Sequence, residues 1–341
     1  MKLLVTGGCG FIGSNFIELA LRNRPDFEIV CLDAFTYAGN LENLENIEFD
    51  PDLSRRFRLV KGSIACREDV VKALKALGSV DAIVNFAAES HVDRSIDGAV
   101  PFVRANVEGA LVLLEEARKL GSVKFLQVST DEVYGSLGAD GFFREDLPLH
   151  PNNPYSVTKA AADMMALAFA HTYGQKVLIT RSSNNYGPRQ YPEKLIPLLI
   201  SNVLDNKEIP VYGDGKQIRD WLHVFDNCRG ILAVLENGTP GQIYNLGGGN
   251  EIENIDLVKR ILDILGAPHT LIRYVQDRPG HDRRYAIDCG KASVFWKPTI
   301  PFGTGLQETV DWYLANKAWV SAIKSGEYKN YYEARYGKLL K

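Results

Sequence analysis

The sequence predicts an α/β protein in which a Rossmann-type, doubly wound parallel sheet is joined to a smaller C-terminal α+β lobe. In the first half of the chain, short apolar runs typical of buried strands alternate with segments whose apolar residues recur at helical spacing. This alternation favours parallel strands joined by right-handed crossovers, and a glycine-rich turn joins the first strand to the first helix. We expect strands at residues 2–6, 29–32, 58–61, 82–86, 125–129 and 176–180, and helices at residues 11–23, 67–77, 101–120, 154–173 and 193–204.

The pattern changes after about Arg181. Turn clusters at residues 212–215, 237–241, 247–250 and 278–280 separate shorter elements, and no flexible linker marks the change. We therefore expect two interlocked parts, residues 1–180 and residues 181–341, with a ligand cleft between them.

The composition is that of a globular protein with a sizeable core. Of 341 residues, 45% are apolar and 24% are charged. A net charge of −3 without a block of basic residues argues against a nucleic-acid-binding protein. No apolar stretch approaches the roughly 20 residues that span a bilayer, so we expect no membrane partner. The five cysteines show no metal-ligand spacing and no signal peptide precedes the first strand, so we expect no metal and a cytoplasmic location.

Three glycines, Gly7, Gly10 and Gly13, recur with the spacing G-x-x-G-x-x-G between the first strand and the first helix. They allow a tight turn, a close approach to a pyrophosphate, and close packing of helix on strand. The anion would lie at the amino end of the helix. Asp33 ends the second strand, where its carboxylate can bond ribose hydroxyls and would repel a 2′-phosphate, so we expect NAD and not NADP. The alternative is a glycine-rich turn that binds nothing.

Small residues follow the fourth strand at Ala87 and Ala88, directly after Phe86. At the carboxyl end of a parallel strand they would let the backbone lie against a cofactor. Alanines that merely allow close helix packing are the alternative.

Tyr155 and Lys159 lie four residues apart in a predicted helix and so share one of its faces. A free phenol, with a pKa of about 10, is a poor base at neutral pH. A nearby ammonium and a positively charged nicotinamide ring would lower the pKa of Tyr155, which could then take a hydroxyl proton as hydride leaves the adjoining carbon. The same spacing also occurs where such side chains only pack.

Two adjacent acids, Asp131 and Glu132, follow Thr130 where the fifth predicted strand ends. Adjacent carboxylates are usually solvated surface residues or helix caps. At the edge where α/β active sites form, however, two crowded acids cannot both ionise easily, so one pKa rises. The pair then offers one proton donor and one acceptor, as a β-elimination beside a ketone requires.

Taken together, these motifs resemble those of the extended short-chain dehydrogenase/reductases, and most closely those of the dTDP-glucose 4,6-dehydratases. The resemblance runs almost from end to end, and the Thr-Asp-Glu signature at residues 130–132 is its most specific part. It rests on residues 7–13, 33–41, 87–96, 129–135, 155–159, 181–188, 193–197, 212–224 and 277–282.

The resemblance implies a three-step cycle on a nucleoside-diphosphate hexose, with NAD regenerated at each turnover. Tyr155 deprotonates the hydroxyl at carbon 4, assisted by Thr130 and Lys159, while hydride passes to NAD. Glu132 then removes the proton on carbon 5 and Asp131 protonates the departing hydroxyl on carbon 6. Hydride finally returns to carbon 6.

The resemblance also implies the binding residues. Cofactor contacts are expected from Gly7, Gly10, Phe11, Ile12, Gly13, Asp33, Thr36, Ser63, Ile64, Phe86, Ala87, Ala88, Tyr155, Lys159 and Asn185. Substrate contacts are expected from Ser90, Asn184, Glu193, Lys194, Leu195, Pro210, Arg219, Asn254, Arg278 and His281. Ser63 stands where the superfamily usually has an aspartate that bonds adenine, which leaves that contact open.

The family also pairs its two long helices across a dyad, so we expect a homodimer. His91 and His223 lack a partner at ligand spacing and are assigned structural roles. The alternatives that remain are an NAD-dependent nucleotide-sugar epimerase or decarboxylase, a 4,6-dehydratase of UDP- or CDP-sugars, and an NAD-binding sensor or scaffold.

Overall fold

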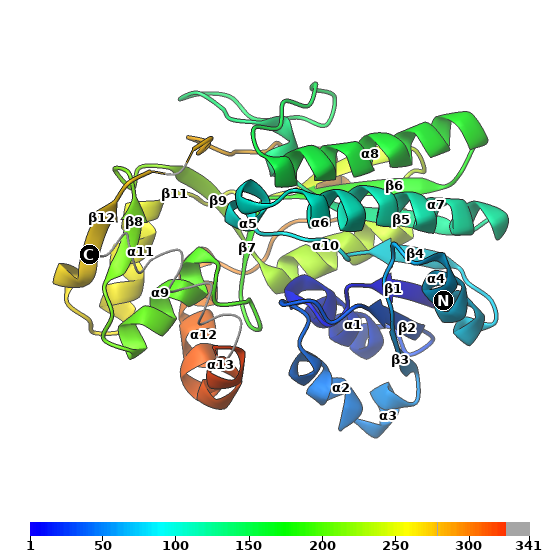
Figure 1. The fold of residues 1–341 in the computed structure, drawn as a ribbon, viewed down its shortest axis with the longest axis horizontal. Helices are drawn as coiled ribbons and strands as arrows, with labels where there is room; N and C mark the ends of the chain where they lie inside the picture. Colours follow the sequence, from blue (N-terminus) through cyan, green and yellow to red (C-terminus); the bar gives the residue numbers. More distant parts are fainter. Residues whose placement is uncertain (278, 325–341) are drawn as a thin grey trace.

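A seven-stranded parallel sheet forms the centre of the fold (Figure 1). The structure is a computed structural model and describes residues 1–277 and 279–324. The strand order is β10-β6-β5-β4-β1-β2-β3, so it reverses between β1 and β4, where open α/β sheets bind ligands. The strands are β1 (Lys2–Thr6), β2 (Glu28–Asp33), β3 (Phe57–Lys61), β4 (Ala82–Asn85), β5 (Lys124–Thr130), β6 (Val177–Ser182) and β10 (Gln242–Leu246). The predicted doubly wound sheet is confirmed.

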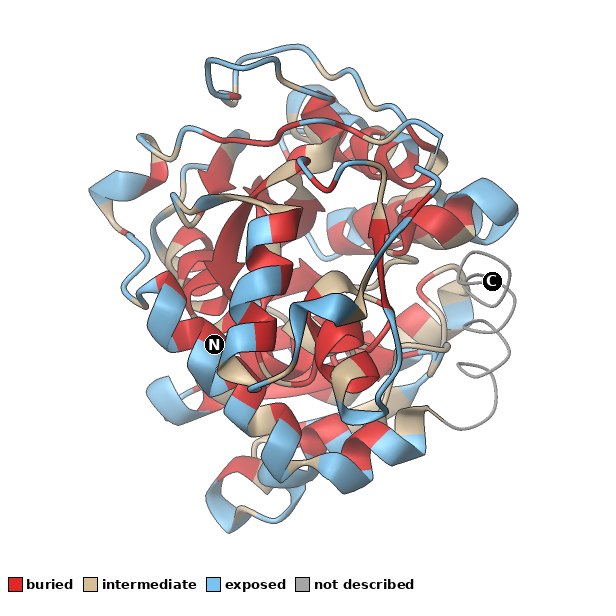
Figure 2. Cartoon of the chain, turned by 90° about the vertical axis from the view of Figure 1, so that its left-hand side faces the viewer, coloured by how far each residue is buried: buried red, intermediate tan, exposed pale blue. Residues whose placement is uncertain are grey.

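Helices cover both faces of this sheet. Along β1, Leu3 and Val5 face one apolar layer and Leu4 faces the other, because successive strand side chains point to opposite sides. Buried residues accordingly concentrate in the strands and on the inner helix faces (Figure 2). One layer holds α1 (Phe11–Asn23) and α10 (Val224–Asn237), and the other holds α4 (Arg67–Leu77), α7 (Gly109–Lys119) and α8 (Pro154–Tyr173). Short helices α2 (Glu45–Glu48), α3 (Pro51–Ser54) and α5 (Val92–Asp97) lie in the connections.

The single helix expected at residues 101–120 is wrong in detail. The segment is divided into α6 (Val100–Phe102), a π-helical stretch (Val103–Glu108) and α7. The wider turn places the buried amide of Asn106 between two other segments. Asn106 accepts the Glu89 N–H at 2.9 Å, and its Nδ2 donates to Glu89 O and to Thr158 Oγ1 at 3.0 and 2.9 Å. These tertiary contacts favour a π turn that helical periodicity does not reveal.

The seventh strand, β10, was not expected from the sequence. It pairs in parallel with β6, and α10 packs on α1, so both elements belong to the large sheet although they follow residue 181. The two predicted parts are therefore interleaved in space.

The remaining segments form a smaller α+β lobe, seen on the left of Figure 1, with its own apolar core. It contains a three-stranded sheet of β7 (Asn184–Tyr186), β9 (Ile218–His223) and β11 (Glu251–Glu253), and a parallel pair of β8 (Ile209–Tyr212) and β12 (Ile272–Val275). Its helices are α9 (Leu195–Leu204), α11 (Asn254–Ile264), α12 (Phe302–Ala315) and α13 (Lys317–Ile323).

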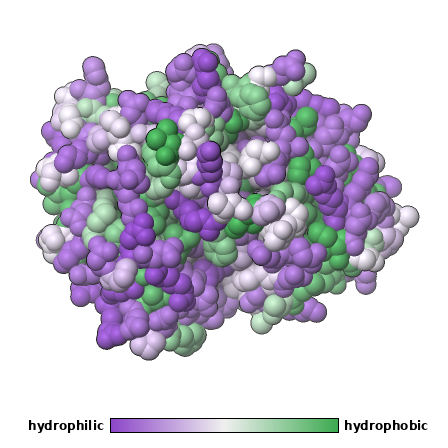
Figure 3. All heavy atoms as spheres, turned by 180° about the vertical axis from the view of Figure 1, so that it is seen from behind, coloured by the Kyte–Doolittle hydropathy of each residue, from purple (hydrophilic) through white to green (hydrophobic). Residues whose placement is uncertain are grey.

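From behind, hydrophilic side chains cover most of the surface, with small hydrophobic patches between them (Figure 3). None of the helices within residues 1–277 and 279–324 has the length and apolarity needed to cross a membrane.

Candidate active site

A cavity of about 330 Å³ opens at the carboxyl ends of the central strands. Every residue expected to contact the cofactor lines it: Gly7, Gly10, Phe11, Ile12, Gly13, Asp33, Thr36, Ser63, Ile64, Phe86, Ala87, Ala88, Tyr155, Lys159 and Asn185. The five candidate catalytic residues, Thr130, Asp131, Glu132, Tyr155 and Lys159, line the same cavity. We refer to it below as the cofactor cavity.

The glycine-rich turn accepts no side chain at two of its positions. Gly7 has a φ of +70°, and a Cβ placed there would lie 2.6 Å from Ala87 N. A Cβ at Gly13 would lie 2.3 Å from Gly7 O. The backbone of α1 therefore meets the end of β1 closely and leaves room for a pyrophosphate at the amino end of the helix.

Asp33 lies at the tip of β2 and organises the loop that follows. Its Oδ2 accepts the Cys9 N–H and its Oδ1 accepts the Phe35 N–H, both at 2.8 Å. Burial raises the pKa of Asp33, and these two backbone donors oppose that rise. Since a carboxylate has further lone pairs, Asp33 can also accept ribose hydroxyls from the cavity side. These features fit an NAD molecule in the cofactor cavity.

The two adjacent acids differ in their surroundings. The Thr130 hydroxyl donates to Asp131 Oδ1 at 3.2 Å and accepts the Glu132 N–H at 3.2 Å, which fixes the turn after β5. Asp131 is buried, and its pKa is raised well above the ordinary value by burial, with Glu132 and Asp220 adding to the rise. Glu132 is half-buried. The fold therefore places a buried carboxyl group, whose neutral form is favoured by burial, beside a more solvated one.

Glu132 is oriented by the start of α8. Asn153 caps that helix by accepting the Ser156 N–H at 2.9 Å and the Ser156 hydroxyl at 3.0 Å. The same hydroxyl lies 3.3 Å from Glu132 Oε2, to which it can donate. The first turn of α8 thereby positions both Glu132 and Tyr155.

Tyr155 and Lys159 are both buried, one turn apart on α8. The Lys159 ammonium donates to Val128 O at 2.7 Å, and burial lowers its pKa to about 8. Burial, followed by the charges of Glu132 and Asp131, raises the pKa of Tyr155, although the Thr130 hydroxyl opposes the rise. In the chain without its cofactor, the pKa of Tyr155 is thus shifted in the direction opposite to the lowering that was expected with a nicotinamide ring beside the phenol. The positive nicotinamide ring is the remaining source of phenolate stabilisation.

A buried ion pair lies behind this site. Arg181 Nε donates to Asp163 Oδ2 at 2.9 Å, and both side chains are almost completely buried. Asp163 follows Lys159 by one helical turn, and its charge opposes the lowering of the Lys159 pKa. Within this pair, the carboxylate of Asp163 is the negative charge that acts on the Lys159 ammonium.

A second cavity of about 160 Å³ lies in the smaller lobe, and we refer to it as the substrate cavity. Leu195, Pro210, Arg219, Asn254 and His281 line it, as expected. Three further candidates, Asn184, Glu193 and Lys194, line both cavities, as does Glu132. Ser90 lines only the cofactor cavity, and Arg278 lies outside the described residues. Glu132 therefore stands where the two cavities meet.

The basic residues of the substrate cavity are held in place by backbone carbonyls. Arg219 donates to Ile218 O and Asp282 O at 2.8 and 3.0 Å, and its guanidinium lies 4.3 Å from the centroid of the Tyr285 ring. Lys194 Nζ donates to Ser90 O at 2.8 Å. A diphosphate entering the substrate cavity would meet both cations.

Sequence reasoning missed several residues that line these cavities. Ser182 ends β6 and Ser183 follows it, and their position at a strand tip could have identified them. Tyr212, Gln217 and Tyr285 also line the substrate cavity. The first two lie within residues 212–224, which carry part of the resemblance, whereas Tyr285 had no sequence signal.

The histidines set aside from metal binding cap helices. His91 is the N-cap of α5 and His223 is the N-cap of α10, and burial lowers the pKa of His223 to about 4. One group of possible metal donors was not anticipated, the buried cluster of Cys9, Cys31 and Asp33, whose donor atoms lie within 4.8 Å of one another.

A Rossmann sheet, a glycine-rich turn and a Tyr-Lys pair in one cavity define an NAD-binding enzyme of the short-chain dehydrogenase/reductase class. Residues 4–309 match the family model described as GDP-mannose 4,6 dehydratase. A dTDP-glucose 4,6-dehydratase of Streptomyces niveus is 48% identical over 331 residues, which cover 95% of this chain and 96% of the relative. The chain therefore belongs to this nucleotide-sugar 4,6-dehydratase family.

Two solved structures agree with this assignment. The dTDP-glucose 4,6-dehydratase of Streptomyces venezuelae, crystallised with NAD and TYD, has a TM-score of 0.90 and 47% identity, covering 95% of this chain and 100% of that one. The enzyme of the same name from Bacillus anthracis, in complex with NAD, has a TM-score of 0.88 and 48% identity at the same coverage.

Proposed function

We propose that the protein is an NAD-dependent hydro-lyase that converts dTDP-glucose into dTDP-4-keto-6-deoxyglucose. The observation that carries this proposal is the position of Asp131 and Glu132. They lie beside Tyr155 in the cofactor cavity, and Glu132 also borders the substrate cavity. An epimerase or decarboxylase oxidises carbon 4 but has no step that needs an acid and a base on neighbouring carbons.

The chain's own groups account for the proton transfers. Tyr155 takes the proton of the carbon 4 hydroxyl, aided by the Thr130 hydroxyl. Glu132 takes the proton on carbon 5, which the new ketone has acidified, and Asp131 gives its proton to the hydroxyl leaving carbon 6 as water. NAD held in the cofactor cavity by the glycine-rich turn and Asp33 would supply the hydride acceptor for carbon 4 and the hydride donor for carbon 6. Glu132 then returns its proton to carbon 5, and the proton taken up by Tyr155 balances the one given up by Asp131, so that exchange with water resets both groups.

The same proposal assigns binding of the cofactor and binding of the nucleotide sugar to different parts of the chain. Residues 1–180, together with α10 and β10, would hold the cofactor, and most of the chain from residue 181 on would hold the nucleotide sugar. Arg219, Lys194, Asn184, Asn254 and His281 would bind the nucleoside diphosphate, with Leu195 and Pro210 along its apolar side.

We also propose a homodimer that pairs through α6 and α8. Apolar side chains are exposed on these elements and the π-helical stretch between α6 and α7: Val100 (78%), Val103 (51%), Val157 (49%) and Met164 (63%). A second copy would remove this surface from water. A cytoplasmic location is proposed because all five cysteines are free thiols.

The test is incubation of the purified protein, with NAD, with dTDP-, UDP-, CDP- and GDP-glucose and with UDP-glucuronic acid, followed by chromatography and mass spectrometry of the products. The proposal expects loss of one water from dTDP-glucose and a 4-keto sugar. A product of unchanged mass would favour an epimerase, and loss of carbon dioxide from a uronic acid would favour a decarboxylase. Turnover of UDP- or CDP-glucose in place of dTDP-glucose would reassign the base. NAD binding without any product would leave only a sensor or scaffold.

A further inference from the structure

Two residues from the dinucleotide part of the chain bind the carboxylate of Glu193. The Tyr37 hydroxyl donates to Glu193 Oε1 at 2.9 Å, and Arg94 Nε donates to Oε2 at 3.0 Å. The Arg94 guanidinium also lies 3.7 Å from the centroid of the Tyr37 ring. Glu193 is buried, so these charge-assisted bonds form out of water. The carboxylate expected to contact substrate is therefore directed at the cofactor side of the cleft.

Tyr37 belongs to the loop that follows β2 and borders the cofactor cavity. Asp33, Thr36 and Gly39 line the cavity, whereas the Tyr37 side chain reaches Glu193. Its ring also packs edge-on against Tyr191, with centroids 5.4 Å apart. A movement of Glu193 would therefore displace Tyr37 and the loop that contains it, against which the adenosine ribose would lie.

Glu193 itself lies in a connecting segment, residues 188–194, which we call the strap. The strap borders the cofactor cavity through Gln190, Tyr191, Glu193 and Lys194. Helix α9 begins only at Leu195, later than predicted, so Glu193 lies in the turn before it.

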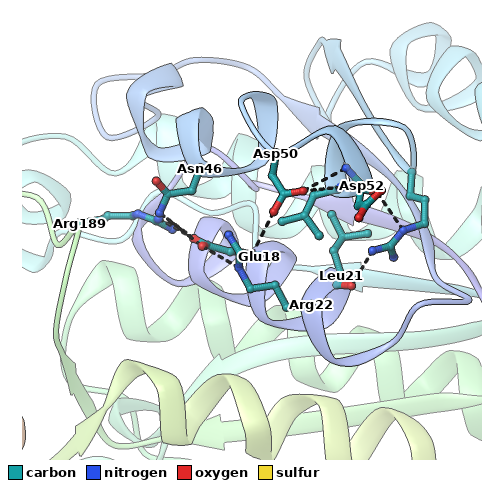
Figure 4. Close-up of polar contacts among 9 residues, drawn as sticks. Glu18, Leu21, Arg22, Asn46, Asp50, Asp52 and Arg189 are labelled. Carbon is teal, nitrogen blue, oxygen red and sulfur yellow. Dashed lines mark hydrogen bonds and ion pairs between the residues drawn. The ribbon is translucent and has the colours of Figure 1, made fainter.

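The other end of the strap is fixed to α1. Arg189 has a φ of +70°, and its Nη2 donates to Glu18 Oε2 at 2.6 Å (Figure 4). Asn15 Nδ2 donates to Pro188 O at 3.1 Å. The strap is thus anchored at one end by α1 and at the other by Glu193.

We propose that Glu193 is a positioning residue: it fastens the strap to the loop after β2 and thereby retains NAD through the catalytic cycle. The inference rests on the proposed function, in which hydride must return to the sugar it came from. If the reduced cofactor dissociated before the last step, the 4-keto intermediate could not receive hydride at carbon 6. The bond from Tyr37 and the ion pair with Arg94 hold the strap across the cavity during that interval.

The experiment measures release of NAD from the purified protein with no sugar present. Glu193→Gln keeps the side-chain shape but replaces one acceptor oxygen by an NH₂ group, and Tyr37→Phe removes only the phenol hydroxyl. We expect each variant to release NAD about tenfold faster than wild type, the order of effect given by one charge-assisted hydrogen bond. The double variant should release it little faster than either single variant, because both substitutions weaken the same connection between the strap and the loop after β2. Tyr173→Phe, which changes an exposed phenol at the end of α8, is the matched control.

Turnover then separates positioning from substrate contact. With saturating added NAD, Tyr37→Phe, whose side chain lines neither cavity, should regain most of its kcat with the KM for the nucleotide sugar nearly unchanged. Thermal unfolding curves in NAD should show that both single variants are folded. Release within about twofold of wild type, or effects that multiply in the double variant, would overturn the proposal. A raised KM with normal NAD release would return Glu193 to the substrate contacts. The NAD-release measurement uses no sugar. It therefore tests the role of Glu193 even if the protein does not dehydrate dTDP-glucose.

Discussion

Replacing Glu132 by glutamine removes the proposed base while preserving its surroundings. The Ser156 hydroxyl, 3.3 Å from Glu132 Oε2, can donate equally to an amide oxygen, and Glu132 is only half-buried. The fold should therefore change little in stability. The amide cannot take a proton from carbon 5, and a positioned base is worth about 10²–10⁴ in rate. At about 1.36 kcal/mol per factor of ten, the elimination barrier should rise by about 2.7–5.4 kcal/mol.

The assay follows a single turnover of dTDP-glucose with enzyme in excess. Oxidation at carbon 4 does not use Glu132, so NADH absorbance should appear and then persist, while the 4-keto-6-deoxy product measured by mass spectrometry falls by the factor above. Glu308→Gln, on the exposed face of α12, serves as a control and should behave as wild type. Product formation in the Glu132 variant within about tenfold of wild type would refute the assignment of the base.

Three other substitutions test separate parts of the site. Tyr155→Phe should suppress even the first oxidation, so rapid NADH formation in stopped flow would contradict its role. Asp163→Asn leaves Arg181 buried without its counter-charge and should lower the free energy of unfolding by about 3–5 kcal/mol in denaturant titration. Asp52→Asn, at an exposed ion pair, should stay within about 0.5 kcal/mol, and equal effects would contradict a special role for the buried pair. Lys159 has its pKa lowered from 10.5 to about 8, so between these values the unfolded chain binds more protons and stability should rise with pH. Lys159→Met should lack this rise, and identical pH profiles of unfolding would show that the lysine does not titrate in that window.

The sequence by itself determined the features that depend on neighbouring residues. Alternating apolar runs determined the six predicted strands, and the helix at residues 11–23 matches α1 residue for residue. The glycine turn and Asp33 were found because spacing along the chain carries their physical signal. Asp131 and Glu132 were found because they follow a buried strand directly, and the tips of parallel strands share one edge of the sheet.

Only the tertiary structure decided features that join distant segments. β10 pairs with β6 across the chain, and the π turn at Asn106 is favoured by bonds to Glu89 and to α8. The raised pKa of Tyr155 comes from burial and from charges gathered by the fold. Glu193 is directed toward Tyr37, which lies 156 positions earlier. Local patterns reflect backbone and side-chain periodicity, whereas these contacts depend on which surfaces meet once the two parts have packed together.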